Sequence, residues 1–420
     1  RLQGKRLDAR FFLEDVVSRA AEACSYLLAV DVEMNTVAGY AMSSWETGYG
    51  DFVMRPDLST LRHLPWHRAS AICHADLVWE NGEPVEASPR RILQRQVGRL
   101  AERGWTALGA TELEFMVFED TYEEAFDSGF RRLTPANRYN VDYSILGTSR
   151  VEPLLGRIRR EMSAAGMRVE SVKGECNFGQ HEMAFLYDEL VPKADEHALY
   201  KTGAKEIASQ EGCSITFMAK YDAREGNSCH VHLSLRAADD SPVFAGNGRH
   251  GMSPVFEHFL AGLLASAADM TLLYAPNVNS YKRFSAGSFA PTAIAWGRDN
   301  RTCAFRIVGH GPSLRVECRI AGGDMNPYLG LAALVAGGLH GVGLELELEP
   351  ELVGNAYTSE APRLPTTMGE AMERFGASAV AREAFGDAVV EHYLNMARVE
   401  LEAFESAVTD WERYRGFERL

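Results

Sequence analysis

Acidic, imidazole and guanidinium side chains recur at every second position in three short segments of the chain. The segments are TELEFMVF, CHVHLSL and LRVECRI, and their alternating polar residues are Glu112, Glu114, His230, His232, Ser234, Arg315, Glu317 and Arg319. Successive side chains of a β-strand point to opposite faces of the sheet. We therefore predict three strands, each with one apolar face and one face that carries groups able to do chemistry.

Carboxylates and one imidazole together form a ligand set for hard divalent cations. A further segment, GECNFGQHE, adds Glu175 and Glu182 around a Gly-Gln turn. Oxygen-rich sites favour magnesium or manganese, whereas zinc prefers more nitrogen and sulfur. Taken singly, paired acids on a strand usually face water, and a lone histidine is usually a core or surface residue. Only the combination predicts a metal site.

Arginines near these segments are suited to hold phosphate or carboxylate. DNRTCAFRIVG supplies Arg301 and Arg306, beside Arg315 and Arg319 of the third segment. A guanidinium offers a planar fork that can donate two parallel hydrogen bonds to an oxyanion, although a surface ion pair is the commoner role for any one arginine. The sequence has no P-loop and no G-x-G-x-x-G after a strand, so a nucleotide would be held in a less common way.

Composition limits the partners of the protein. The formal net charge of the 420 residues is −15, which argues against nucleic acid and anionic membranes as partners. Seven cysteines are scattered without a C-x-x-C pair, so we expect a reduced, cytoplasmic protein rather than a disulfide scaffold. No signal peptide is visible, and the apolar stretch YLGLAALVAGGLHGV is shorter than a membrane span. We expect that stretch to form a buried helix.

The composition changes near residue 87, where we place a domain boundary. Before it lie short strand-like runs, and after it SPRRILQRQVGRLAERG has the pattern of a helix that Ser88 caps and Gly104 ends. Further helices are predicted over residues 151–166, in KADEHALYKTGAKEIASQEG, and from Thr367 to the end of the chain. We therefore expect an α+β protein with domains at residues 1–86 and 87–420.

The order of the motifs resembles that of the glutamine synthetases over nearly the whole chain. The motifs are ELEF, GECNFGQHE, FMAK, NSCHVHLSL, NSYKRF, AW…DNR and RVECRIAGGDMNPY. SSWETGYGDFVMRPDLSTLR and NSYKRFSAGSFAPT are closer to the branch that ligates glutamate to amines, which includes the γ-glutamylpolyamine synthetases. The resemblance implies an N-terminal β-grasp domain and a catalytic domain with a funnel of antiparallel strands. It also implies a site completed by a neighbouring subunit, in a dodecamer of two hexameric rings.

The resemblance assigns roles to individual residues. The implied ligands of two or more Mg²⁺ or Mn²⁺ ions are Glu114, Glu175 and Glu182 on the side of glutamate and the acceptor, and Glu112, His230 and Glu317 on the side of ATP. The residues implied to hold glutamate are Arg283, Arg319 and Gly226. Those implied to hold ATP are Arg301, Arg306, His232 and Ser234. The residues implied to act in catalysis are Arg301, Glu182 and Arg283.

The implied reaction joins L-glutamate to an amine in two steps. The γ-carboxylate of glutamate attacks the γ-phosphorus of ATP, and an amine then attacks the resulting γ-glutamyl phosphate. The acyl phosphate is hydrolysed if water reaches it, so a covering loop is useful. The segment Phe284–Ala290 is suited to that task because it consists mainly of small residues.

Two departures from the ammonia-using enzymes predict a larger acceptor. Where those enzymes read P-G-x-E-A-P, this chain reads AGSFAP, with Phe289 in the position of the glutamate. Where they read FDGSS, it reads YAMSS, with Ala41 in the position of the aspartate. Both changes remove an anion that would hold ammonium, so we predict an organic amine such as a polyamine, ethanolamine or another monoamine. Phe289 would either contact the acceptor or pack the loop shut.

Two other functions stay open. One is an ordinary ammonia-dependent glutamine synthetase. The other is a catalytically silent relative that binds glutamate or nucleotide, although the presence of every implied metal ligand and phosphate arginine argues against it. A further departure is Asn177-Phe178, where related amine ligases often have Gly-Pro. The spacing from Glu175 to Glu182 is unchanged, so the metal prediction stands beside an altered pocket wall.

Overall fold

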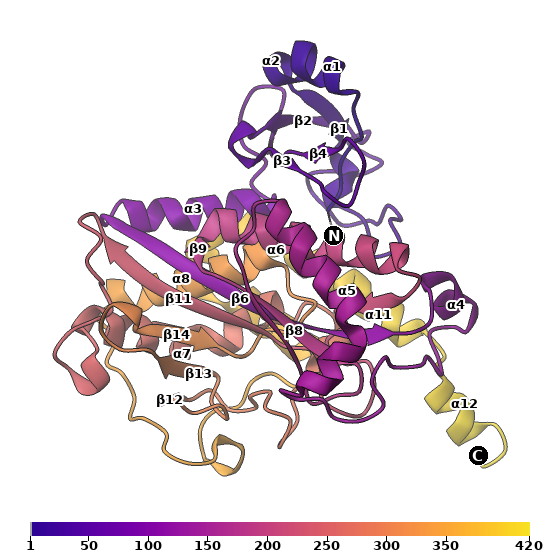
Figure 1. Ribbon diagram of the computed structural model, residues 1–420. Coiled ribbons are helices and arrows are strands. Elements are labelled where there is room, and N and C mark those ends of the chain that lie inside the picture. The colour runs from indigo at the N-terminus through magenta and orange to yellow at the C-terminus, as the bar shows by residue number, and fades with distance from the viewer. Residues whose placement is uncertain (1) are drawn as a thin grey trace.

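Two groups of strands organise the chain, which a computed structural model describes over residues 2–420 (Figure 1). The first strands form a small antiparallel sheet in the order β1-β2-β5, with a separate pair β3-β4 beside it. These strands are β1 (Ala21–Cys24), β2 (Asp51–Pro56), β3 (Arg62–His63), β4 (Ala71–Ile72) and β5 (Ala75–Val78). Two helical turns, α1 (Ala9–Phe11) and α2 (Val17–Arg19), precede them. In Figure 1 this indigo part lies together at the top, above α3.

A nine-stranded sheet forms the centre of the larger part of the chain. Its main order is β12-β13-β14-β11-β6-β8-β7, and β9 and β10 pair with the long strand β6. All pairs are antiparallel except β12 with β13. The strands are β6 (Trp105–Phe118), β7 (Val169–Gly174), β8 (Gln180–Phe185), β9 (Asp188–Glu189), β10 (Ser214–Thr216), β11 (Cys229–Ala237), β12 (Trp296–Arg298), β13 (Phe305–Val308) and β14 (Arg315–Cys318). The predicted mixture of helices and antiparallel strands is confirmed.

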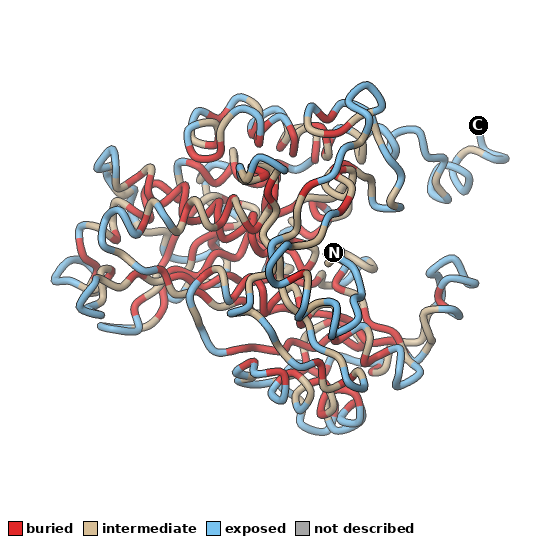
Figure 2. Tube along the Cα trace, turned by 90° about the horizontal axis from the view of Figure 1, so that it is seen from above, coloured by how far each residue is buried: buried red, intermediate tan, exposed pale blue. Residues whose placement is uncertain are grey.

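Helices cover the large sheet and complete the core. They are α3 (Pro89–Ala101), α4 (Tyr122–Asp127), α5 (Ile145–Ala164), α6 (Leu190–Gln210), α7 (Pro254–Tyr274), α8 (Pro327–Gly343), α9 (Met368–Ala377), α10 (Ala379–Phe385), α11 (Asp387–Ser406) and α12 (Asp410–Gly416). Helices α3 and α6 pack on β6, and α7 packs on α8. Figure 2 shows buried residues running through this layered body, whereas the C-terminal segment is exposed.

The close contact of α7 with α8 depends on glycines at the helix crossing. A Cβ on Gly262 would lie 2.2 Å from the carbonyl oxygen of Gly337 and 2.5 Å from the backbone nitrogen of Gly341. No side chain fits there, so the two backbones touch. Helix α7 is the one helix of the described residues that is long and apolar enough to cross a membrane, and 67% of its apolar window is buried inside the protein. The apolar stretch at 328–342 forms α8 and is buried, as predicted.

Helix α3 begins where the sequence predicts, whereas helix α5 begins earlier. Helix α3 begins at Pro89, with Ser88 at the N-cap position, but the Ser88 side chain makes no capping hydrogen bond there. Helix α5 begins at Ile145 rather than at residue 151, because Ser144 caps it and accepts a hydrogen bond from the nitrogen of Gly147 at 3.0 Å. Its first turns are exposed, so they carry no apolar periodicity. The C-terminal region is mostly helical, as predicted.

A buried arginine ties the small sheet to the large part of the chain. Arg90, in the first turn of α3, pairs with Asp57 at 2.7 Å and Asp76 at 2.5 Å in the N-terminal part. It also pairs with the buried Asp195 of α6 at 3.0 Å, and Tyr328 of α8 donates to the same carboxylate at 2.6 Å. The network therefore spans both groups of strands.

Candidate active site

The register of the large sheet brings the predicted polar positions together as cross-strand neighbours. His230 of β11 lies opposite Glu112 of β6, and Glu182 of β8 lies opposite Glu114 of β6. On the other side of β11, Glu317 of β14 lies opposite His232. Directly opposed side chains in an antiparallel pair are close neighbours on one face. Four strands thus contribute to a single polar surface.

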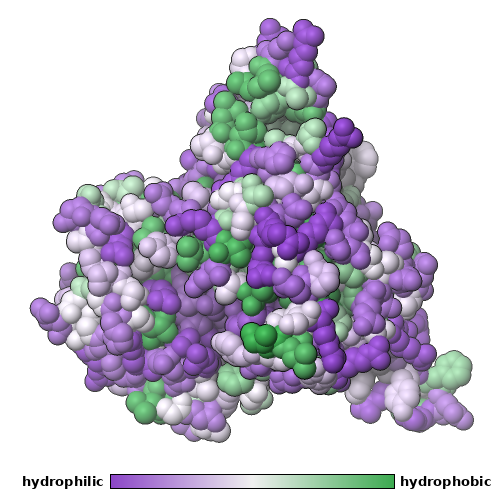
Figure 3. Space-filling view, viewed as in Figure 1, coloured by the Kyte–Doolittle hydropathy of each residue, from purple (hydrophilic) through white to green (hydrophobic). Residues whose placement is uncertain are grey.

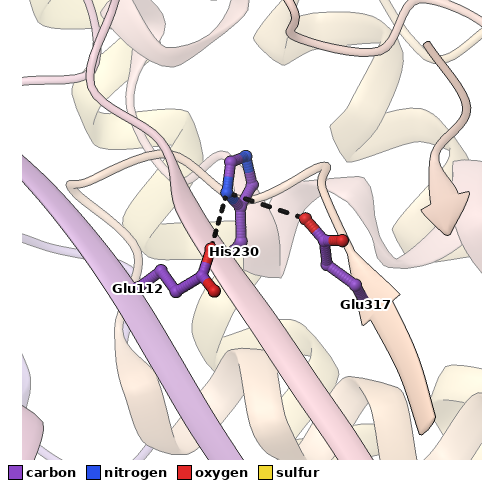
Figure 4. Close-up of side chains that lie close together, drawn as sticks. All are labelled: Glu112, His230 and Glu317. Atoms are coloured by element: carbon purple, nitrogen blue, oxygen red, sulfur yellow. Dashed lines mark hydrogen bonds and ion pairs between the residues drawn. The ribbon is translucent and has the colours of Figure 1, made fainter. Parts of the chain in front are cut away.

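Glu112, His230 and Glu317 form the first cluster of this surface (Figure 4). His230 Nδ1 lies 3.3 Å from Glu112 Oε2 and 3.8 Å from Glu317 Oε1. The figure shows the imidazole standing between two carboxylates that come from β6 and β14. Among residues 2–420, His230 Nε2 is buried and has no hydrogen-bond partner. The first cluster therefore has an unused imidazole nitrogen as well as carboxylate oxygens.

Glu114 and Glu182 form a second cluster with the same histidine. One ligand atom from each of Glu114, Glu182 and His230 lies within 4.8 Å of the others, and all three residues are buried. Glu114 Oε2 accepts hydrogen bonds from the nitrogen of Ser228 at 2.6 Å and from Gln180 Nε2 at 3.1 Å. These donors fix the Glu114 carboxylate. His230 thus joins the two clusters into one site.

Glu175 is connected to the second cluster through the side chain of Lys173. Its carboxylate belongs to a separate group with Asp142 and Cys176. Lys173 Nζ contacts the Glu175 carboxylate directly and lies 3.5 Å from Glu182 Oε1. An ammonium group therefore connects Glu175 with Glu182. A lone lysine in a strand is usually a solvated cation, so the role of Lys173 cannot be predicted from its sequence context.

The carboxylates of the site differ strongly in their affinity for protons. Burial, together with the nearby charge of Glu112, raises the pKa of Glu182 to about 8. Burial would also raise the pKa of Glu112, but hydrogen bonds from His230 and His232 outweigh it and hold that pKa well below its ordinary value. For Glu317, the nearby His230 and Arg319 outweigh burial and lower the pKa to about 2. Several carboxylates in one buried site favour a compensating cation.

Two arginines pair with Glu317 at the edge of the first cluster. Arg306 Nη1 donates to Glu317 Oε2 at 2.7 Å, and Arg319 Nη1 donates to Glu317 Oε1. Arg306 Nε also donates to Asp299 at 2.9 Å. Arg301 lies in the exposed turn between β12 and β13, and its charge adds to that of Arg306 in holding the pKa of Asp299 below its ordinary range. Cations thus border the carboxylates on this side.

Arg283 is buried at the end of the short helix η5 (Val278–Arg283). Its guanidinium donates to Ser228 Oγ at 3.3 Å, to the carbonyl oxygen of Arg319 at 3.3 Å, and to that of Ile320. Gly226 lies against it: a Cβ there would be 2.2 Å from the carbonyl oxygen of Ala219 and 3.0 Å from Arg283 Cγ. Only glycine therefore fits at position 226. The structure thus places all three residues predicted to bind glutamate, Arg283, Arg319 and Gly226, next to one another.

Comparison with proteins of known sequence and structure identifies the family to which this chain belongs. A model of the glutamine synthetase catalytic domain matches residues 86–415. The chain belongs to the glutamine synthetase family. Gamma-glutamylethanolamide synthetase GlnA4 from Streptomyces coelicolor is 63% identical over 420 residues, which cover 100% of this chain and 90% of that protein. Glutamate–isopropylamine ligase from a Pseudomonas species is 36% identical over 419 residues, covering 98% and 91%. A solved structure described as a GmaS/ADP complex has a TM-score of 0.86 at 28% identity, covering 97% of this chain and 92% of that one.

Two residues predicted for the nucleotide pocket of this glutamine synthetase family member lie along β11. His232 Nε2 donates to Glu112 Oε1 at 2.9 Å, and Arg315 Nε donates to His232 Nδ1 at 3.2 Å. Ser234 follows on the same strand face and is half-buried. Figure 3 shows a hydrophilic recess in the face of the molecule that carries the large sheet. His232 is thus joined to the first cluster, and Ser234 lies farther along the strand.

The two residues predicted for the acceptor pocket do not line one cavity in the described part of a single chain. The Phe289 side chain is 55% exposed, with a left-handed backbone at φ 57°, and its carbonyl oxygen accepts from Arg319 Nη2 at 3.3 Å. Its ring therefore does not pack the loop against the core of this chain. Ala41 lines a cavity of about 460 Å³ together with Trp79 and His392. No residue of the two clusters lines that cavity in the described part of the chain.

Gln180 and Asn177 organise the site beyond the predicted residues. Gln180 Nε2 donates to Glu114 and to the carbonyl oxygen of Gly226 at 3.0 Å. Asn177 is buried, and its Nδ2 donates to Asp222 at 3.0 Å and to the carbonyl oxygen of Glu225 at 2.7 Å. Asn177 thus holds the loop that leads to Gly226. The sequence marks Asn177 only as a departure from related enzymes, because an amide side chain in a turn gives no distinctive signal of its contacts.

Proposed function

We propose that this chain is an ATP-dependent ligase that joins the γ-carboxylate of L-glutamate to an organic amine through γ-glutamyl phosphate, with ethanolamine as the first acceptor to test. The observation that carries the proposal is the pair of buried clusters that share His230, with Arg306 and Arg319 at their edge. The relatives named for an ethanolamide and for isopropylamine ligation support an amine acceptor.

The donor set fits hard divalent cations. It consists of carboxylate oxygens and one imidazole, includes no thiolate within the two clusters, and leaves the buried His230 Nε2 without a partner among the described residues. We assign two or more Mg²⁺ or Mn²⁺ ions per site to Glu112, Glu114, Glu175, Glu182, His230 and Glu317. When bound, these ions offset the repulsion between the triphosphate and the attacking carboxylate.

The side chains of this protein would position the reactants. Arg283 and Arg319, with the backbone of Gly226, bind glutamate, while Arg301 and Arg306 bind the phosphates of ATP. Glu182 faces the acyl group. A γ-carboxylate oxygen of glutamate attacks the γ-phosphorus, and ADP leaves. The amine nitrogen then attacks the acyl carbon and loses a proton, and inorganic phosphate leaves. Orientation and charge compensation supply most of the rate enhancement in such reactions.

The acceptor would enter between two subunits. We assign Phe289 of one subunit and Ala41 of its neighbour to the acceptor pocket, which agrees with the absence of Phe289 from the lining of the Ala41 cavity in one chain. This assignment requires an N-terminal domain over residues 1–86 with a β-grasp fold, a catalytic domain over residues 87–420, and a ring assembly, for which we propose a cytoplasmic dodecamer. The finer choice among ethanolamine, polyamines and other monoamines depends on residues of both subunits.

An amine panel tests the function. ATP- and glutamate-dependent phosphate release is measured with ammonia, methylamine, isopropylamine, ethanolamine, putrescine and spermidine. We expect turnover with at least one organic amine, ethanolamine first, and little with ammonia. Turnover with ammonia alone would make the protein an ordinary glutamine synthetase. Stabilisation by metal and ATP in a melting experiment, without turnover on any amine, would make it a silent relative.

A further inference from the structure

Asp324 holds the short helix that ends in Arg283. Its Oδ2 accepts hydrogen bonds from Asn277 Nδ2 at 2.8 Å and from Ser280 Oγ at 2.6 Å. Asn277 is the N-cap residue of η5, and Ser280 lies within it. Because η5 spans only six residues, fixing its start also fixes the backbone of Arg283 at its end. The carboxylate of Asp324 therefore controls where the Arg283 side chain begins.

The other oxygen of Asp324 approaches Arg283 itself. Within the described residues, Asp324 Oδ1 and Arg283 Nε are both buried and both without a hydrogen-bond partner. Both lie beside Gly322: a Cβ at that position would be 2.7 Å from Asp324 Oδ1 and 3.6 Å from Arg283 Nε. An unpaired acceptor of Asp324 and an unpaired donor of Arg283 thus lie close to the same glycine, where no side chain separates them.

The charges around Arg283 leave a specific role for Asp324. Burial lowers the pKa of Arg283, and the carboxylates that oppose this effect are Glu114 and Asp324, whereas Arg319 adds to it. Glu114 belongs to the second cluster and hydrogen-bonds there to Ser228 and Gln180. The nearby Lys201 Nζ donates to the carbonyl oxygen of Gly323 and is also close to Asp324. Asp324 is thus an anion that faces Arg283 from outside the metal clusters.

We propose that Asp324 is a positioning residue that orients Arg283 for glutamate, through η5 and beside Gly322. The proposal rests on the proposed function, in which Arg283 binds a carboxylate of glutamate. A guanidinium that is already oriented loses less conformational freedom when it binds an oxyanion. Asp324 touches neither the clusters nor the predicted nucleotide residues in any contact described here. Its loss should therefore weaken glutamate binding more than ATP binding.

Asp324→Asn removes the charge and keeps the shape of the side chain. We expect the KM for glutamate to rise by about ten- to a hundredfold, because a buried cation loses its counter-charge and its orientation. The KM values for ATP and ethanolamine and the kcat at saturating glutamate should change by less than about threefold. An unchanged glutamate KM, or an equal rise in all three KM values, would overturn the proposal.

Two further variants make the test specific. Ser280→Ala removes one of the two donors to Asp324 but keeps its charge, so the glutamate KM should rise by about threefold. Asp120→Asn is the matched control: Asp120 is also a half-buried aspartate that holds a loop, accepting from the nitrogen of Thr134 at 2.6 Å, but it has no contact with η5 among the described residues. It should leave the glutamate KM unchanged. If Asp324→Asn does not fold, Ser280→Ala alone decides, and an unchanged KM there would count against the proposal.

The assay separates this inference from the proposed function. If the unmodified protein turns over no amine, the proposed function fails, and glutamate binding is then measured by calorimetry in the presence of Mg²⁺ and ADP. Weaker glutamate binding by Asp324→Asn than by the unmodified protein would still support the role of Asp324. Equal binding by both proteins would overturn it, whatever the outcome of the amine panel.

Discussion

One chain contains the whole polar face of the large sheet, but it does not contain a complete acceptor pocket of the predicted kind. On the sheet, His230 contacts carboxylates from two neighbouring strands, and Arg306 and Arg319 pair with one of them. At the predicted acceptor pocket, Phe289 is largely exposed, and Ala41 lines a different cavity. The register of one sheet thus assembles the metal site that we propose, whereas the acceptor pocket that we propose requires surfaces from two subunits.

The largest expected effect comes from a substitution in the metal site on the polar face of the sheet. Glu182→Gln should reduce phosphate release by at least about a thousandfold, because it removes a charged ligand from the second cluster. The variant should fold, with a melting temperature equal to or above that of the unmodified protein, because the raised pKa of Glu182 shows that its charge is unfavourable in the ligand-free site. Glu170→Gln, an exposed position on the neighbouring strand β7, is the control and should keep full activity. Retained activity in Glu182→Gln would refute the assignment of the site.

A second variant tests the link between the N-terminal part, which contains Ala41, and the large part, which contains the polar face of the sheet. Arg90 is buried and pairs with Asp57 and Asp76 on one side and with Asp195 on the other. Arg90→Ala should lower the free energy of unfolding by about 3–5 kcal/mol, because it leaves buried carboxylates without their partner. Urea denaturation measures this loss.

The neighbouring residue Arg91 provides the control for this experiment. Its Nε lies 3.7 Å from Glu86, and its side chain is more than a third exposed. Arg91→Ala should cost less than about 1 kcal/mol, as exposed ion pairs usually do. Equal losses for both variants would show that the Arg90 network does not join the two regions.

The smallest expected effect concerns the choice of acceptor at the predicted acceptor pocket. Phe289→Glu restores an anion where the sequence departs from the ammonia-using enzymes. The ratio of kcat/KM for ethanolamine to that for ammonia should fall by about tenfold, because the carboxylate favours a small cation over an alkyl chain. Phe289→Leu keeps an apolar side chain and should preserve the ratio. An unchanged ratio in Phe289→Glu would remove Phe289 from the acceptor pocket.

Sequence reasoning found the polar faces of the sheet, because alternation along a strand follows from its geometry. It did not find the register that sets His230 opposite Glu112, because the sequence of one strand does not indicate which distant strand pairs with it or in which register. It also did not identify Lys173, which contacts Glu175 and Glu182, or Asp324, which lies beside the backbone of Gly322. The start of α5 was placed too late because its first turns are exposed.

The most direct test of the central claim is a crystal structure of the protein with Mn²⁺, examined by anomalous scattering. The account predicts at least two anomalous peaks in the site. One should lie among Glu112, His230 and Glu317, and the other should lie beside Glu114 and Glu182. A fully ordered site without such peaks, or peaks at other positions only, would contradict the claim that these side chains hold the metal ions of a glutamate–amine ligase.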